Sequence, residues 1–213
     1  MQSYSDGFMN DNTEITSSNS MRHQYNQSKK TRSVTFRLDS FVIDEMQREA
    51  DQKEISLNVL VNQTLKRYCS WDRYETKIGM MPVPKIVLTS LIDKATTMAK
   101  DNGIQNIEHY RDVIIKQAAK IAFGLMKDSV LLMKKQYNLW VILSVLEEYM
   151  KVSDIKADHK IEGRKHIFVV QHELGENWSL FTKELLTLIF ENLAKVRIEY
   201  NITSNTVIAE VVL

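Results

Sequence analysis

The spacing of apolar residues changes several times along this chain, and each change predicts a new element. Residues 33–38 alternate polar and apolar side chains, which is the period of a β-strand. Apolar residues then recur every three or four positions in residues 41–53 and 57–68, as on one face of a helix. Ser56 is placed to cap the second of these helices. The first part of the chain therefore predicts a strand followed by two helices.

Beyond residue 84 the pattern predicts three helices, a β-hairpin, another helix and two final strands. The expected helices are residues 86–100, 106–135 with Asn106 as the cap, 138–150 and 177–193. The expected strands are residues 152–157, 165–172, 196–202 and 206–213, with the hairpin turning around residues 159–163. We therefore expect an α+β fold whose C-terminal domain has a β-β-α-β-β order after a helical segment.

Composition divides the chain into four expected parts. Residues 1–31 are rich in Ser, Asn and Gln and poor in large apolar residues, so we expect a disordered tail, with a short docking helix as the alternative. Residues 32–75 hold the strand and two helices, and residues 76–84 form a linker because each proline disfavours helix in the residue before it. Residues 71–78 either prolong the second helix or belong to this linker. Residues 85–213 form the second domain.

Several functional classes are unlikely on composition alone. No apolar run approaches the ~18–20 residues that span a bilayer, and the N-terminus lacks the features of a secretory signal. Cys69 is the lone cysteine of the 213 residues, so a reducing compartment is expected. Glycine-rich phosphate loops are missing as well. We expect a cytoplasmic protein with no membrane partner.

Residues 32–68 resemble the ribbon-helix-helix family of DNA-binding proteins. The resemblance lies in R-S-V-T-F-R-L, then D-S-F-V-I-D-E-M-Q-R-E-A, then I-S-L-N and V-L-V-N-Q-T-L-K-R-Y. Glu54 departs from the family, which often has glycine in the turn between the helices, and a residue with a side chain pays for a positive φ there. Asn58 also departs, since a second Ser or Thr is common at that position.

A unit of one strand and two short helices cannot bury its own core, so it should form a homodimer. If two such strands pair, Val34, Phe36 and Leu38 point into the shared core and the residues between them point outward. A two-stranded ribbon fits the DNA major groove. The resemblance then implies that Ser33, Thr35 and Arg37 contact bases. Phosphate contacts are expected from Lys29, Lys30, Arg32, Ser56, Leu57 and Asn58, the last two through free N–H groups at a helix start.

Charge is divided along this region although the net charge of the chain is only +1. Residues 21–38 contain bases and no acid, whereas residues 39–54 are mainly acidic. The bases are Arg22, Lys29, Lys30, Arg32 and Arg37, and the acids are Asp39, Asp44, Glu45, Glu49, Asp51 and Glu54. A ribbon that faces DNA, backed by a helix turned away from the phosphates, should show this division.

The second domain offers weaker candidates. His159, His166 and His172 lie in the expected hairpin, but the last two are about 20 Å apart along a strand, too far to ligate one ion, and we expect no metal site. The stretch H-E-L-G-E-N-W-S resembles segments of archaeal proteins, from which no function follows. Because strand-to-helix loops often bind ligands, it is the first candidate for an effector pocket, with a packed turn as the alternative; its residues are His172, Glu173, Trp178 and Ser179.

The leading hypothesis is a transcription regulator that binds double-stranded DNA as a homodimer or a pair of dimers. Its second domain would oligomerise or bind a small-molecule or protein effector. One alternative is an antitoxin-like or assembly protein whose C-terminal domain binds a protein partner. The other is an enzyme, but no convergent set of nucleophile, base and oxyanion donors is visible, so we expect no catalytic residues and no cofactor.

Overall fold

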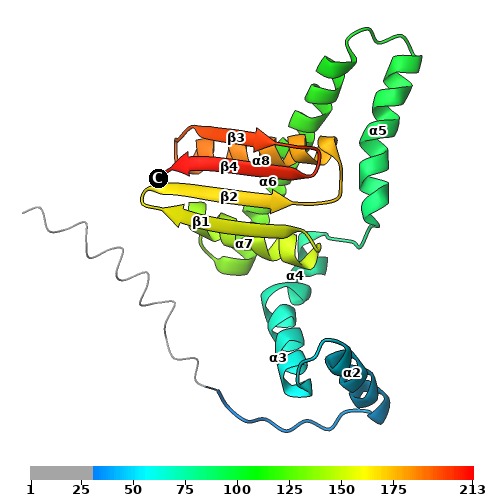
Figure 1. The fold of residues 1–213 in the computed structure, drawn as a ribbon, viewed down its shortest axis with the longest axis vertical. Helices are drawn as coiled ribbons and strands as arrows, with labels where there is room; N and C mark the ends of the chain where they lie inside the picture. The colour runs from blue at the N-terminus through cyan, green and yellow to red at the C-terminus, as the bar shows by residue number, and fades with distance from the viewer. Residues whose placement is uncertain (1–30) are drawn as a thin grey trace, which may run out of the picture. The chain divides into compact units, whose positions relative to one another are not determined.

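The computed structural model describes residues 31–213, which contain helices and a four-stranded antiparallel sheet (Figure 1). The expected α+β class is therefore confirmed. The chain divides into two compact units, Met1–Ile55 and Ser56–Leu213. Residues 1–30 of the expected tail, together with Lys29 and Lys30 as phosphate contacts, lie outside the described residues.

In the first unit, residues 31–39 have no regular secondary structure and lead into helix α2, Ser40–Gln52. The helix is the one that the sequence predicts. The strand expected at residues 33–38 is not formed in this single chain, and a strand needs a neighbour to satisfy its backbone hydrogen bonds. At the end of α2, the N–H of Ile55 donates to the carbonyl of Ala50 and that of Glu54 to Asp51, which is a Schellman motif.

The second unit begins with a continuous helical segment that changes its winding. Helix α3, Leu57–Arg67, passes into the π-helix η1, Tyr68–Asp72, then into α4, Arg73–Glu75, and the 3₁₀ turn η2, Thr76–Ile78. The residues that we expected either to prolong the second helix or to join the linker are thus helical to Ile78. The rest of the expected linker, residues 79–84, has no helix or strand.

Four longer helices follow: α5 Lys85–Asp101, α6 Ile107–Lys134, α7 Leu139–Val152 and α8 Glu176–Leu193. As expected, the side chain of Asn106 caps α6, and its Oδ1 accepts the N–H of His109 at 3.0 Å. Within residues 31–213, no helix combines the length and the hydropathy that crossing a membrane requires.

The sheet consists of β1 Lys156–Glu162, β2 Lys165–Gln171, β3 Ile198–Ile202 and β4 Thr206–Val212. Its order is β1-β2-β4-β3, with every neighbouring pair antiparallel. The expected hairpin is present, but its first strand starts at Lys156, later than the residues 152–157 that the pattern predicted. Residues 159–162 therefore belong to β1, and the turn lies at residues 163–164.

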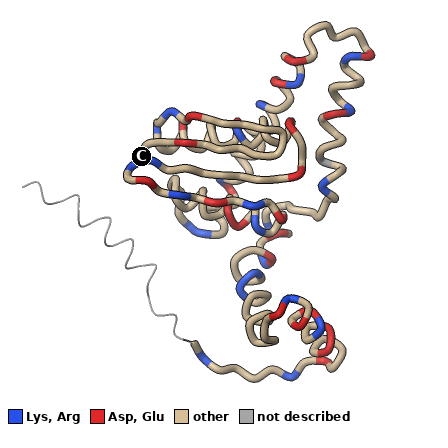
Figure 2. Tube along the Cα trace, viewed as in Figure 1, with Lys and Arg blue, Asp and Glu red and all other residues tan. Residues whose placement is uncertain are grey.

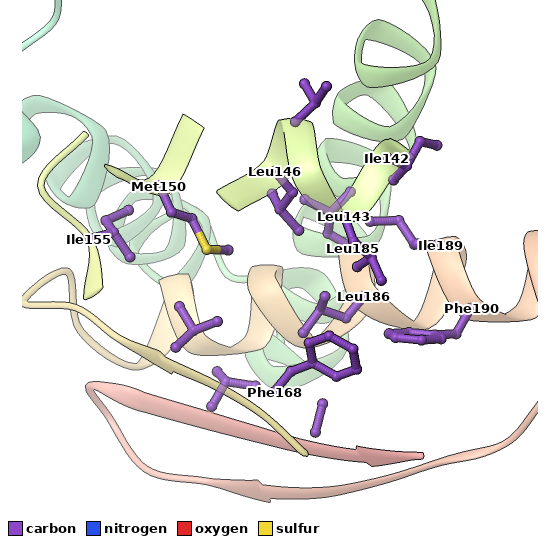
Figure 3. Packing of buried hydrophobic residues seen from close by; sticks show 14 of the residues in the cluster. Ile142, Leu143, Leu146, Met150, Ile155, Phe168, Leu185, Leu186, Ile189 and Phe190 are labelled. Carbon is purple, nitrogen blue, oxygen red and sulfur yellow. The ribbon is translucent and has the colours of Figure 1, made fainter. Parts of the chain in front are cut away.

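Helices α7 and α8 cover one face of the sheet (Figure 1). Helix α6 packs against α8 and not against the sheet. Phe168 on β2 and Phe190 on α8 meet with their ring centroids 5.3 Å apart (Figure 3). Trp71 of the π-helix is buried in the same apolar core. Because Trp71 belongs to the core of the second unit, the boundary between the two compact units lies at Ile55 rather than near residues 76–84.

Glu54, which stands where the family often has glycine, adopts the left-handed conformation with φ of 54°. We expect Glu54→Gly to raise the free energy of unfolding by about 0.5–1 kcal/mol, because glycine removes a penalty of ~1–2 kcal/mol and adds a smaller entropic cost. The control is Asp44→Gly inside α2, which should lower stability by about 0.5–1 kcal/mol. Urea titration at constant protein concentration measures both, and equal losses in the two variants would contradict the expectation.

Candidate functional site

The segment before α2 exposes three apolar side chains that alternate along it. Val34, Phe36 and Leu38 are 66%, 62% and 49% exposed. The intervening residues Ser33, Thr35 and Arg37, which the sequence predicts as base contacts, are exposed as well. Because polar and apolar side chains alternate, any extended conformation of this segment has one apolar face and one polar face. The apolar face has no cover in the single chain.

The charges around this segment remain divided in the structure. Two acids of α2 pair with bases of the same unit: Glu45 with Arg48, and Glu49 with Lys53 at 2.5 Å. Arg32 and Arg37 have no ion-pair partner among residues 31–213. Figure 2 shows Lys and Arg in blue along the segment before α2, and Asp and Glu in red together with some blue on α2. The bases that could meet a polyanion are therefore not neutralised locally.

The second group of predicted phosphate contacts lies at the start of α3, in the other compact unit. Ser56 caps this helix through its Oγ, which accepts the N–H of Val59 at 3.3 Å. Leu57 and Asn58 belong to the first turn, whose backbone N–H groups have no intrahelical acceptor. The side chain of Asn58 is exposed. The helix start therefore presents the free donors that the sequence implied.

The residues predicted as an effector pocket lie in three different settings. His172 and Ser179 are buried, with the imidazole Nε2 2.9 Å from the Ser179 Oγ. Glu173 is exposed, and Trp178 lines an apolar cavity. The N–H of Leu174 donates to Nδ1 of His172 at 3.2 Å, so the proton of the neutral ring is on Nε2, which donates to Ser179. The ring therefore cannot accept a proton from Ser179. The hydrogen bond between His172 and Ser179 links the loop after β2 to α8.

A polar pocket of about 340 Å³ adjoins this loop, lined by residues of α5, α6 and the start of α8. Arg111 at its wall pairs with Glu108 at 2.5 Å and Glu176 at 3.6 Å. Asn177 donates to Asp93 at 2.8 Å, and its Oδ1 is buried without a partner among the described residues. The charged side chains Arg111, Glu176 and Asp93 of this pocket thus already have partners among neighbouring side chains.

Two of the three hairpin histidines come together, a pairing that the sequence analysis missed. Nε2 of His159 on β1 lies 2.9 Å from Nδ1 of His166 on β2. His159 is opposite Phe168, so the two imidazoles are diagonal neighbours on the sheet face toward α7, where Trp140 packs against both. The sequence placed His159 in the turn rather than on β1, so a contact between His159 and His166 was not expected.

The histidine pair has no further ligands for a metal ion. Among residues 31–213, no group of three or more His, Cys, Asp or Glu side chains is arranged to hold one. Burial lowers the pKa of His166, and burial followed by the neighbouring His166 lowers the pKa of His159. Both rings therefore favour the neutral form, which suits an aromatic stack with Phe168 at 4.1 Å from His159.

Comparison with models of protein families found no match for this chain, and a search of curated proteins found none either.

The lowered histidine pKa values make stability depend on pH. An unfolded histidine binds a proton as the pH falls below about 6.5, whereas the folded His159 resists protonation, so acid favours unfolding. We expect the free energy of unfolding to decrease from pH 7 to pH 5.5, and to decrease less in His159→Gln than in the wild type.

Urea titration at the two pH values measures this difference. The control is His109→Gln, which changes an exposed histidine on α6 and should leave the decrease as in the wild type. A decrease of the same size in His159→Gln and the wild type would contradict the role of His159.

Proposed function

We propose that this protein is a transcription regulator that binds double-stranded DNA sequence-specifically as a homodimer, through a two-stranded ribbon formed by residues 33–38 of two copies. The observation that carries the proposal is the uncovered alternating apolar face of Val34, Phe36 and Leu38. We place its action in the cytoplasm, with residues 85–213 as the regulatory or oligomerisation part.

A second copy supplies what the segment lacks. Covering an exposed Val, Leu or Phe contributes roughly 1.5–3 kcal/mol for each side chain. Antiparallel pairing with the same segment of another protomer would also satisfy backbone groups that have no ladder partner in the single chain. The two apolar faces would then meet, which leaves Ser33, Thr35 and Arg37 of both copies on the outer face.

This outer face has the chemistry of a major-groove reader. Arg37 can donate two hydrogen bonds to the O6 and N7 of guanine, while Ser33 and Thr35 can bond to base edges. Arg32 and Arg37, which have no acidic partner among the described residues, would attract the phosphates. The N–H groups at the start of α3, aided by the helix dipole, provide a backbone clamp.

The dimer predicts opposite effects for the same substitution at two adjacent residues. Phe36→Asp places a carboxylate in the proposed shared core, so we expect mostly monomer in sedimentation-velocity experiments at micromolar concentration. Thr35→Asp places it on the outer face, so the dimer should persist and the DNA affinity should fall. The proposal would be contradicted if both variants stay dimeric, or if the wild type is a monomer.

DNA recognition predicts a specific loss for Arg37→Ala. A site would first be selected from random duplexes with the wild-type protein. Arg37→Ala should then weaken binding by about 1–3 kcal/mol at the selected sequence and by less on unrelated DNA, as measured by fluorescence anisotropy at two salt concentrations.

The matched control is Arg48→Ala, which removes an arginine that is paired with Glu45 on α2 and should bind almost as the wild type does. Failure of the selection to enrich any sequence, or equal losses for the two arginines, would count against the proposal.

A further inference from the structure

An apolar cavity of about 250 Å³ lies in the second compact unit, between the π-helix and the helices α6, α7 and α8, and is partly open to solvent where Met80 and Leu125 are exposed. Aromatic side chains make up much of its wall, namely Trp71, Tyr149, Trp178 and Phe181. Trp71 and Tyr149 lie 6.0 Å apart between ring centroids, and Trp178 and Phe181 lie 5.0 Å apart. No charged residue is among those that line it. The cavity is therefore built for an uncharged, mainly apolar occupant.

Polar atoms in the wall narrow the chemistry further. The side chains of the lining that can form hydrogen bonds are uncharged, namely Trp71, Ser129, Tyr149 and Trp178. Each of these side chains carries an N–H or O–H donor, and the indole N–H of tryptophan can only donate. An acceptor oxygen on the ligand would therefore suit this lining.

The cavity also borders the helical segment that begins with α3 and contains the π-helix. Trp71 belongs to the π-helix Tyr68–Asp72, and such single π-turns are rare and frequently mark functional sites. The same continuous helical segment begins with α3 and ends at Ile78, which lines the cavity together with Gly79 and Met80. An occupant would thus contact both the segment that starts with α3 and the core helices.

We propose that this cavity binds a small, uncharged aromatic compound that carries a hydrogen-bond acceptor, and that its occupancy changes the DNA affinity through α3. A volume of about 250 Å³ suits one or two rings, since an apolar cavity of ~150 Å³ admits benzene. A charged ligand is disfavoured because the lining offers no countercharge for its lost hydration. The regulatory part rests on the proposed DNA-binding function, whereas the binding part does not.

The binding test uses the full chain labelled with 5-fluorotryptophan and acetophenone as the probe. The sequence has three tryptophans, of which Trp71 and Trp178 line the cavity and Trp140 packs against the histidine pair. Two of the three ¹⁹F resonances should shift with saturation, and the third should not. Shifts in all three, or no saturable shift up to the solubility limit of acetophenone, would overturn the site.

Ala122→Leu on α6 fills the cavity and should weaken acetophenone binding at least tenfold. The control is Gln117→Leu, which puts the same side chain at an exposed position of the same helix and should bind as the wild type does. Circular dichroism establishes that both variants are folded, and the labelled wild type tests the site even if one of them is not. Unchanged binding in a folded Ala122→Leu variant would overturn the assignment.

The regulatory part is tested on the selected DNA duplex with and without saturating acetophenone. We expect a change of at least threefold in the affinity of the wild type and none in Ala122→Leu. Unchanged affinity in the wild type would overturn the coupling to α3. Resonance shifts in a protein that binds no DNA would overturn the DNA-binding proposal and would still support the ligand site, so the two failures are distinguishable.

Discussion

The burial of α8 between the sheet and α6 is the constraint on which most of the second compact unit depends. A helix covered on two sides must be apolar over most of its circumference, and α8 buries Leu185, Leu186, Ile189 and Phe190. Its buried polar Ser179 is acceptable only because His172 donates to it. The loop before α8 is held at its other side by Asn205, whose Oδ1 accepts the N–H of Gly175 at 3.1 Å. The start of α8 is thus fixed from two directions.

This constraint explains why one short stretch contributes to three different environments. His172 and Ser179 turn inward to complete the packing of the loop, while the polar pocket forms beside residues 174–177. One residue before Ser179, Trp178 contributes to the apolar cavity. The other lining residues come from the helical segment with Trp71 and from α6 and α7.

The N-terminal segment presents the opposite situation. Val34, Phe36 and Leu38 lie on a chain that has no regular secondary structure and no apolar cover, so the hydrophobic effect favours association with a partner surface. If a second copy is the partner, as we propose, the alternation that hides the apolar side chains also presents the polar ones. Under the proposed function, the free energy that assembles the dimer also orients Arg37. Oligomerisation and DNA recognition would then be properties of the same six residues.

Periodicity and capping residues predicted nearly all helices, because helix formation depends on neighbours three or four positions away and on local caps such as Ser56 and Asn106. Glu54 stands where the family often has glycine, and the structure shows that it nevertheless adopts a positive φ. β1 was harder to place, since it is a mostly exposed strand with polar sequence and has little alternating apolar signal. The apolar Val152 before it belongs to the end of α7, and Ile155 is buried in the connection that follows the turn at residues 153–154.

What the sequence by itself determined is therefore local: the helices, their caps, the alternation of residues 33–38 and the division of charge. Only the tertiary structure decided which distant residues meet. The register of β1 and β2 brings His159 to His166, and the packing of α6, α7 and α8 against the π-helix opens a cavity beside Trp71 and Trp178. Such contacts depend on strand register and on how helices pack, which are set by many residues together and leave no short motif in the chain.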